Sequence, residues 1–164
     1  MHLIRLSSRQ LTIGGLGYQI HDLFFIVSEC ELHTSLQVED NEILLLTSPN
    51  FPNDYSNSLK CVWYFVAADN DVAGGPDHFT ISIQHFDLED GYDVVSFGAG
   101  GSNTTQEDNG AGLNLGDYID ILPILIGGDY MWIRFTSDGY HDARRGFFLE
   151  IGRTGTKITC NHNS

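Results

Sequence analysis

Acidic residues gather in one short stretch of the sequence. Asp87, Glu89, Asp90 and Asp93 place four carboxylates within seven positions, and Asp138 closes a separate apolar segment further along the chain. Carboxylates this close repel one another unless a cation or hydrogen-bond donors compensate their charge. The stretch therefore predicts a site for a cation. The alternative is a set of solvated turn residues, since Asp and Gly are common in turns.

The segments beside these acids have the pattern of β-strands. Residues 79–86 alternate Phe79, Ile81, Ile83 and His85 with more polar side chains, which is the two-residue period of a strand. Residues 94–97 indicate a second short strand, and residues 130–136 alternate up to Ser137-Asp138-Gly139. We expect the acidic loops to meet at one end of a sandwich of strands.

The rest of the chain continues this pattern without a helical segment. Apolar runs at 42–46, 61–67, 118–121 and 147–151 predict strands, whereas the two prolines of 47–55 predict a rigid loop whose Phe51 and Tyr55 pack down. We predict an all-β, antiparallel β-sandwich of about 8–10 short strands in two sheets. Its core would contain Trp63, Phe65, Ile81, Ile83, Val95, Ile133, Phe135 and Phe147.

Length and charge restrict the classes of function. The 164 residues suit one domain, with 8 basic and 22 acidic residues giving a formal net charge of −14. That charge disfavours nucleic acid and anionic membranes, and it favours cations and basic partners, although solubility alone would also explain it. No stretch approaches the roughly 20 apolar residues of a membrane span.

Three regions follow from composition. Residues 1–28 lack clear periodicity and contain Arg5 and Arg9, so they read as an imperfect signal peptide or a truncated start. Residues 29–153 form the expected domain, and 154–164 a polar tail or a linker to a following module. The sequon Asn103-Thr104-Thr105 lies in a polar loop and predicts N-glycosylation at Asn103.

The cysteine count allows one internal disulfide at most. Of Cys30, Cys61 and Cys160, the first two are the nearer pair, and Cys160 lies past the last predicted strand, where it would bond a following module. Three free thiols in a cytosolic protein are the alternative.

Catalysis is not indicated. Glu89 with Asp93 or Asp138 has the composition of a glycosidase carboxylate pair, but these acids sit on predicted surface loops without an apolar wall to raise one pKa. The seven histidines are scattered and show no zinc-binding spacing. We therefore predict that these residues do not form an enzyme.

The motifs resemble those of the CUB domain family over about residues 30–151. The matching pieces, in family order, are Ser48-Pro49-Asn50-Phe51-Pro52 with Tyr55, Cys61-Val62-Trp63, Phe86-Asp87-Leu88-Glu89, Tyr92-Asp93-Val94-Val95, Phe135-Thr136-Ser137-Asp138 and Gly146-Phe147. The resemblance implies an extracellular, jelly-roll-like module, secreted or on the cell surface, that binds other proteins. It also implies that Cys30 and Cys61 form the family's first disulfide.

The resemblance further implies a Ca²⁺ site formed by Glu89, Asp93 and Asp138. In such members the ion holds an acidic rim that receives a Lys or Arg side chain of a partner protein. This chain lacks the family's second disulfide, has a shorter Glu89–Asp93 loop than most calcium-binding members, and carries Tyr140 where they often have Ser. Asp142 or Asp90 would replace the missing Ser oxygen.

Two other roles remain open under the same resemblance. Exposed rings such as Tyr92, Tyr118 and Tyr140 would stack on sugars in a glycan- or small-ligand-binding, spermadhesin-like module. The domain would alternatively be a non-catalytic accessory part of a larger secreted metalloprotease.

Overall fold

The structure is a computed structural model. It describes residues 4–6, 11–13, 16–18, 24–28, 30, 35–39, 42–68, 78–100, 113–115, 123–140 and 143–154. The strands are β1 (Ile4–Leu6), β2 (Leu11–Ile13), β3 (Leu16–Tyr18), β4 (Phe24–Val27), β5 (Leu36–Val38), β6 (Ile43–Thr47), β7 (Lys60–Ala67), β8 (His78–Asp87), β9 (Val94–Ala99), β10 (Leu113–Leu115), β11 (Ile124–Gly127), β12 (Tyr130–Thr136) and β13 (Gly146–Thr154).

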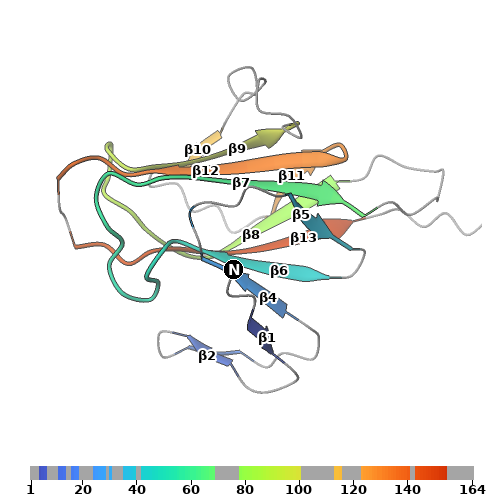
Figure 1. The fold of residues 1–164 in the computed structure, drawn as a ribbon, viewed down its shortest axis with the longest axis horizontal. Coiled ribbons are helices and arrows are strands. Elements are labelled where there is room, and N and C mark those ends of the chain that lie inside the picture. Colours follow the sequence, from blue (N-terminus) through green and yellow to red (C-terminus); the bar gives the residue numbers. More distant parts are fainter. Residues whose placement is uncertain are drawn as a thin grey trace, which may run out of the picture.

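Two sheets pack face to face as the predicted all-β sandwich (Figure 1). One sheet has the order β1-β4-β6-β13-β8-β11 and the other β10-β9-β12-β7-β5, while β2 and β3 form a separate pair. Neighbouring strands are antiparallel except for β4–β6 and β5–β7, which are parallel. Among the described residues there is no helix long and apolar enough to cross a membrane.

Strict alternation places the core between the sheets. On β7, Cys61, Trp63, Phe65 and Ala67 are buried while the residues between them are half-buried. Seven of the eight residues predicted for the core belong to the buried hydrophobic core of the structure. The eighth, Ile83, is partly buried and packs against it. Three aromatic rings fix the packing of the two sheets, because Phe147 meets Trp63 and Phe135 edge to face with centroids 6.1 and 5.3 Å apart.

The predicted alternation of β8 fails at its end. Leu149 pairs with Ile83 but Phe148 pairs with His85, so the register shifts by one residue at a β-bulge. Beyond the bulge Phe86 lies opposite Phe147 and packs against the core, in place of His85. The bulge thus sets the direction in which Asp87 and the acidic loop leave the sheet.

The N-terminal part of the chain also contributes to the sandwich. Cys30 and Cys61 are joined by a disulfide. From the segment predicted as a lead, β4 pairs with β6, and Val27 is buried in the core. Several predictions fall on residues outside those described: the Asn103 sequon, the strand at 118–121 with the Tyr118 ring, and the pairing of Cys160.

Candidate metal site

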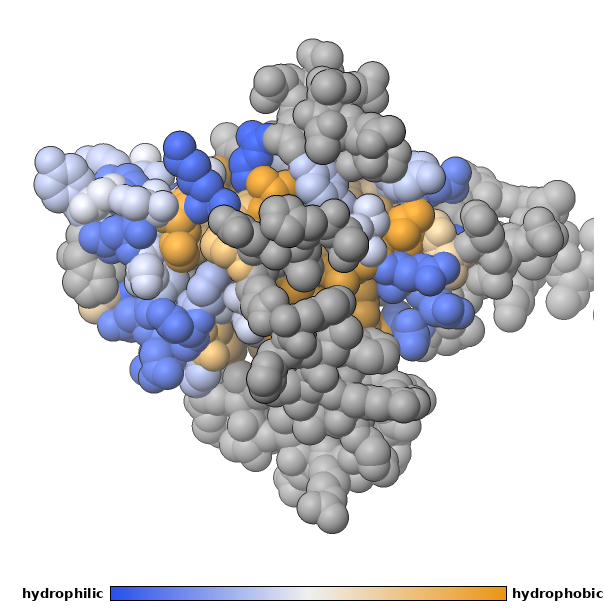
Figure 2. All heavy atoms as spheres, in the orientation of Figure 1, coloured by the Kyte–Doolittle hydropathy of each residue, from blue (hydrophilic) through white to orange (hydrophobic). Residues whose placement is uncertain are grey.

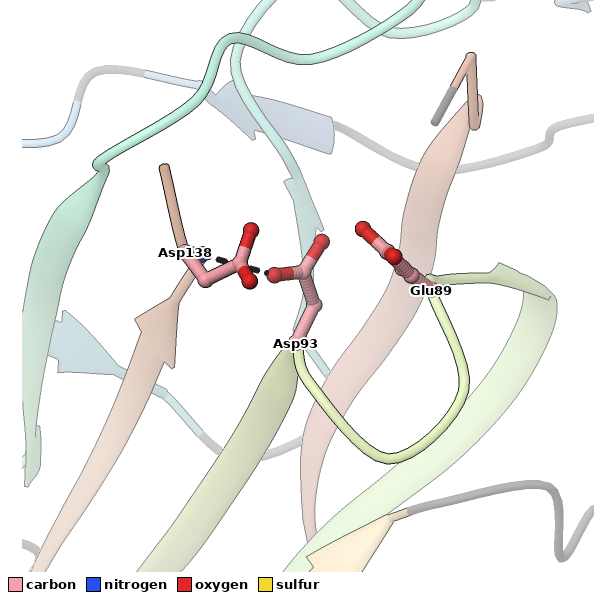
Figure 3. A group of neighbouring side chains, drawn as sticks. All are labelled: Glu89, Asp93 and Asp138. Atoms are coloured by element: carbon pink, nitrogen blue, oxygen red, sulfur yellow. Dashed lines mark hydrogen bonds between the residues drawn. The ribbon is translucent and has the colours of Figure 1, made fainter. Parts of the chain in front are cut away.

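Two loops meet at one end of the sandwich, on the left in Figure 1, and bring three predicted ligands together: the β8–β9 turn carries two of them and the loop after β12 carries the third. Glu89 follows β8, Asp93 precedes β9 and Asp138 follows β12. One carboxylate oxygen from each lies within 4.8 Å of the other two. Figure 3 shows the three carboxylates side by side, with Asp93 between the others.

The β8–β9 turn holds Glu89 and Asp93 at this spacing. The N–H groups of Tyr92 and Asp93 both donate to the Glu89 carbonyl, over 3.4 and 3.1 Å. Gly91 has a φ of 75°, which is in the left-handed region. Glycine adopts this conformation at little energetic cost because it has no Cβ. The short turn therefore carries the two acids back toward each other.

Asp93 is the centre of the cluster and is buried, with a relative exposure of 5%. Its Oδ1 accepts a hydrogen bond of 2.8 Å from the Asp138 N–H, drawn as a dashed line in Figure 3. Its Oδ2 accepts one from the Tyr55 hydroxyl. Each carboxylate oxygen has about two acceptor positions, so each retains one for a cation.

Tyr55 bridges two of the ligands. Besides donating to Asp93, its hydroxyl accepts a 3.2 Å hydrogen bond from the Glu89 N–H. Burial raises the pKa of the Tyr55 hydroxyl well above its usual range, and the hydrogen bond to Asp93 raises it further. The hydroxyl is therefore a permanent donor at physiological pH. The sequence analysis predicted the packing of Tyr55 but missed this role, although a buried Tyr hydroxyl usually has a partner.

A buried serine anchors the loop that carries Tyr55. The Ser48 Oγ accepts a 3.1 Å hydrogen bond from the Phe147 N–H and donates to the Arg145 carbonyl. Gly146 packs directly on it: its φ is 89°, and a Cβ there would clash with Ser48 Oγ. The start of the loop is thereby fixed to β13.

The Asp138 loop is braced by residues 56–59. The Ser58 N–H donates to the Asp138 carbonyl over 2.6 Å, and the Asn57 Nδ2 donates to the Gly139 carbonyl over 3.2 Å. The Ser137 Oγ donates to the Ser56 carbonyl and accepts from the Leu59 N–H. Asp138 Oδ1 itself accepts a 2.8 Å bond from the Tyr140 N–H. Backbone and side-chain hydrogen bonds thus hold the Asp138 loop in place.

The donor set fits a hard cation. Ca²⁺ prefers carboxylate oxygens at about 2.3–2.6 Å, so ligands on opposite sides of one ion lie about 4.6–5.2 Å apart. The three acids satisfy that spacing. Asp87 does not belong to them, because it forms an ion pair with Arg144 over 3.3 Å.

The structure describes only one of the two acids suggested as additional ligands, Asp90 and Asp142. Asp90 is exposed in the same loop and is not part of the three-carboxylate cluster. Asp142 lies outside the described residues.

The surface around the cluster is hydrophilic on the face shown in Figure 2, where the end bearing these loops is mostly blue to white. Two exposed rings, Tyr92 and Tyr140, stand next to the ligands in the chain, with relative exposures of 65% and 81%.

Comparison with known proteins identifies a family. The family model described as CUB domain matches residues 34–150. Neuropilin-1a of Danio rerio is 33% identical over 128 residues, covering 73% of this chain and 12% of that protein. Cubilin of Homo sapiens is 33% identical over 108 residues, covering 63% of this chain and 3% of that protein. The chain thus spans a small part of the curated relatives it matches.

Solved structures agree on the fold. The CUB1-EGF-CUB2 region of human MASP-1/3 superposes with a TM-score of 0.53 at 21% identity, covering 68% of this chain and 41% of that one. The full extracellular region of zebrafish Gpr126/Adgrg6 gives 0.54 at 24% identity, covering 74% of this chain and 15% of that one.

Proposed function

The chain belongs to the CUB domain family, and we propose that it is an extracellular, non-catalytic protein-interaction module whose acidic end binds Ca²⁺ and receives a basic side chain of a partner. The observation that carries the proposal is the meeting of Glu89, Asp93 and Asp138 within 4.8 Å. These are the three residues to which the family resemblance assigned the calcium ligands, and they meet although the Glu89–Asp93 loop is shorter than in most calcium-binding members.

The hydrogen bonds around the acids favour a binding role. They orient the carboxylates while leaving acceptor positions open, which suits an ion that takes several oxygens at once. When bound, the ion would neutralise most of the cluster's charge. The Cys30–Cys61 disulfide supports an extracellular location, since disulfides persist in oxidising compartments.

Charge supports a basic partner. The whole chain has a formal net charge of −14, and a cationic side chain that reaches ionised carboxylates makes charge-assisted hydrogen bonds. Binding of such a partner should weaken with a chelator and with ionic strength.

The test is isothermal titration of Ca²⁺ into the wild-type protein and two variants. Asp93→Asn removes one ligand charge but keeps an oxygen for the Asp138 N–H, so it disturbs the fold less than Ala would. Because even outer-shell changes reduce metal affinity about 10–100-fold, we expect a loss beyond about 100-fold. Asp54→Asn, the matched control, removes the same charge from an exposed acid outside the cluster and should change affinity by less than about twofold.

A wild-type isotherm with no heat of calcium binding would contradict the metal site. An Asp93→Asn isotherm equal to that of Asp54→Asn would show that the ion binds elsewhere.

A further inference from the structure

Of the three exposed aromatic side chains among the described residues, two lie next to metal ligands in the chain. Among the described residues, five large hydrophobic side chains are exposed, and the two most exposed are Tyr140 and Tyr92. Tyr140 lies two positions after Asp138, and Tyr92 immediately precedes Asp93. The other three, Ile43, Leu125 and Tyr130, lie on strands.

The backbone that carries Tyr140 is held in place although its side chain is exposed. Its N–H donates to Asp138 Oδ1 over 2.8 Å, and the preceding Gly139 carbonyl accepts from Asn57 Nδ2. Tyr92 is tied to Glu89 by its own N–H. Rings on fixed backbones lose little conformational entropy when a partner binds, which is why Tyr is frequent among the residues that dominate binding energy.

With Ca²⁺ bound, the three carboxylates would keep a negative charge that one further cation can neutralise. Three ionised carboxylates carry −3, and one Ca²⁺ adds +2, so a charge of −3 + 2 = −1 remains. A single Lys or Arg of a partner would neutralise it. Lys and Arg differ in what they gain from a neighbouring ring.

We propose that Tyr140, together with Tyr92, makes this site select the guanidinium of an arginine over the ammonium of a lysine; the inference rests on the function proposed above. A planar guanidinium can stack on a tyrosine ring while its N–H fork donates to a carboxylate. An ammonium is compact and strongly hydrated, so it gains less from the same ring. The chain already contains an Arg–aromatic contact, with the Arg134 guanidinium carbon 5.5 Å from the centre of the Trp132 ring.

The experiment uses two probes that differ in one residue, the peptides acetyl-Gly-Ser-Arg-Ser-Gly-amide and acetyl-Gly-Ser-Lys-Ser-Gly-amide. Each is titrated into the calcium-saturated protein, and dissociation constants are obtained from backbone amide chemical shifts. We expect the wild type to bind the arginine peptide about two- to fivefold more tightly, as one exposed cation–π contact provides. Tyr140→Phe should keep this ratio, Tyr140→Leu should lower it, and the double variant Tyr92→Leu/Tyr140→Leu should bring it close to one.

Tyr130→Leu is the matched control. Tyr130 is also exposed, but it lies at the far end of β12, more than about 20 Å along the strand from Asp138, so the ratio should not change. Equal affinity for both peptides in the wild type, or an unchanged ratio in Tyr140→Leu, would overturn the inference while leaving a basic-partner site intact. If neither peptide binds although Ca²⁺ does, the proposed basic partner is wrong and the inference fails with it.

Discussion

The Tyr55 hydroxyl offers the most direct perturbation of the site's internal support. Tyr55→Phe removes one oxygen and leaves the ring, which packs edge-on against Phe135 with centroids 5.2 Å apart. The change therefore creates almost no cavity. It deprives Asp93 Oδ2 of a donor and the Glu89 N–H of an acceptor.

The size of the effect follows from these two contacts. The hydrogen bond to the Asp93 carboxylate is charge-assisted and buried, and such bonds contribute about 1.5–3 kcal/mol. The bond from Glu89 N–H, at 3.2 Å, is a neutral one of about 0.5–1.5 kcal/mol. Without calcium, we expect the free energy of unfolding to fall by about 2–4 kcal/mol in total. With a urea m-value near 2 kcal/mol/M, the midpoint should fall by about 1–2 M.

The assay is urea unfolding followed by intrinsic fluorescence, in a chelator so that no metal contributes. Tyr130→Phe is the matched control, because it makes the same change on a ring that is 40% exposed, and its midpoint should stay within about 0.3 M of wild type. If the two variants unfold at the same urea concentration, the hydroxyl does not support the cluster, and the account of the site's preorganisation is refuted.

Three further predictions concern residues that are not ligands themselves. Burial raises the pKa of Glu150, and a hydrogen bond from Gln84 partly offsets this rise. The protonated form is therefore favoured in the folded state. Its contribution to the free energy of unfolding is fully present below about pH 4.5 and is lost as pH rises through the raised pKa. Glu150→Gln should therefore raise Tm at about pH 7 but not at about pH 4, and an equal shift at both would contradict this. Gly91→Ala should cost about 1–2 kcal/mol of backbone strain, since nothing lies within 4 Å of its added Cβ. Gly146→Ala should lower the free energy of unfolding by about 1–3 kcal/mol more than Gly91→Ala, because its Cβ would also clash with Ser48. Chemical denaturation measures both losses, and equal losses for the two variants would rule out the clash.

The sequence predicts those parts of the fold that depend on local alternation. Residues 61–67 alternate between buried and half-buried positions, and Trp63 and Phe65 were predicted on the buried face. On residues 130–136 Ile133 and Phe135 were predicted in the core, although the buried Trp132 interrupts the alternation there. At the end of β8 the same reasoning fails, because a bulge is a mismatch between two strands. Nothing in residues 79–86 alone reveals that the register with β13 passes over Gln84. The parallel pairing of β4 and β5 is equally invisible to periodicity, since it depends on which strand lies next to them.

The candidate site was likewise predictable only in part: its ligands were predicted from the sequence, and the residues that support them were not. Acids at the ends of predicted strands can be recognised from the sequence, and the CUB resemblance selects three of them. Their supports cannot, because each is a contact across a long stretch of chain: Tyr55 reaches Asp93 over 38 residues and Asn57 reaches Gly139 over 82. A serine or an asparagine in a loop has no pattern that distinguishes a brace from a solvated residue.

These supports decide what a cation would do for the molecule. Carboxylates in a turn need either a cation or hydrogen-bond donors, and the structure supplies donors from Tyr55 and from the Asp138 backbone. Because those donors already hold Asp93 in position, ion binding need not order the loops, and its free energy can appear as affinity rather than as folding. The hydrogen bonds to Asp93 and the bracing of Asp138 thus argue for a site that exists before its ion, in which the backbones of Tyr92 and Tyr140 are already held.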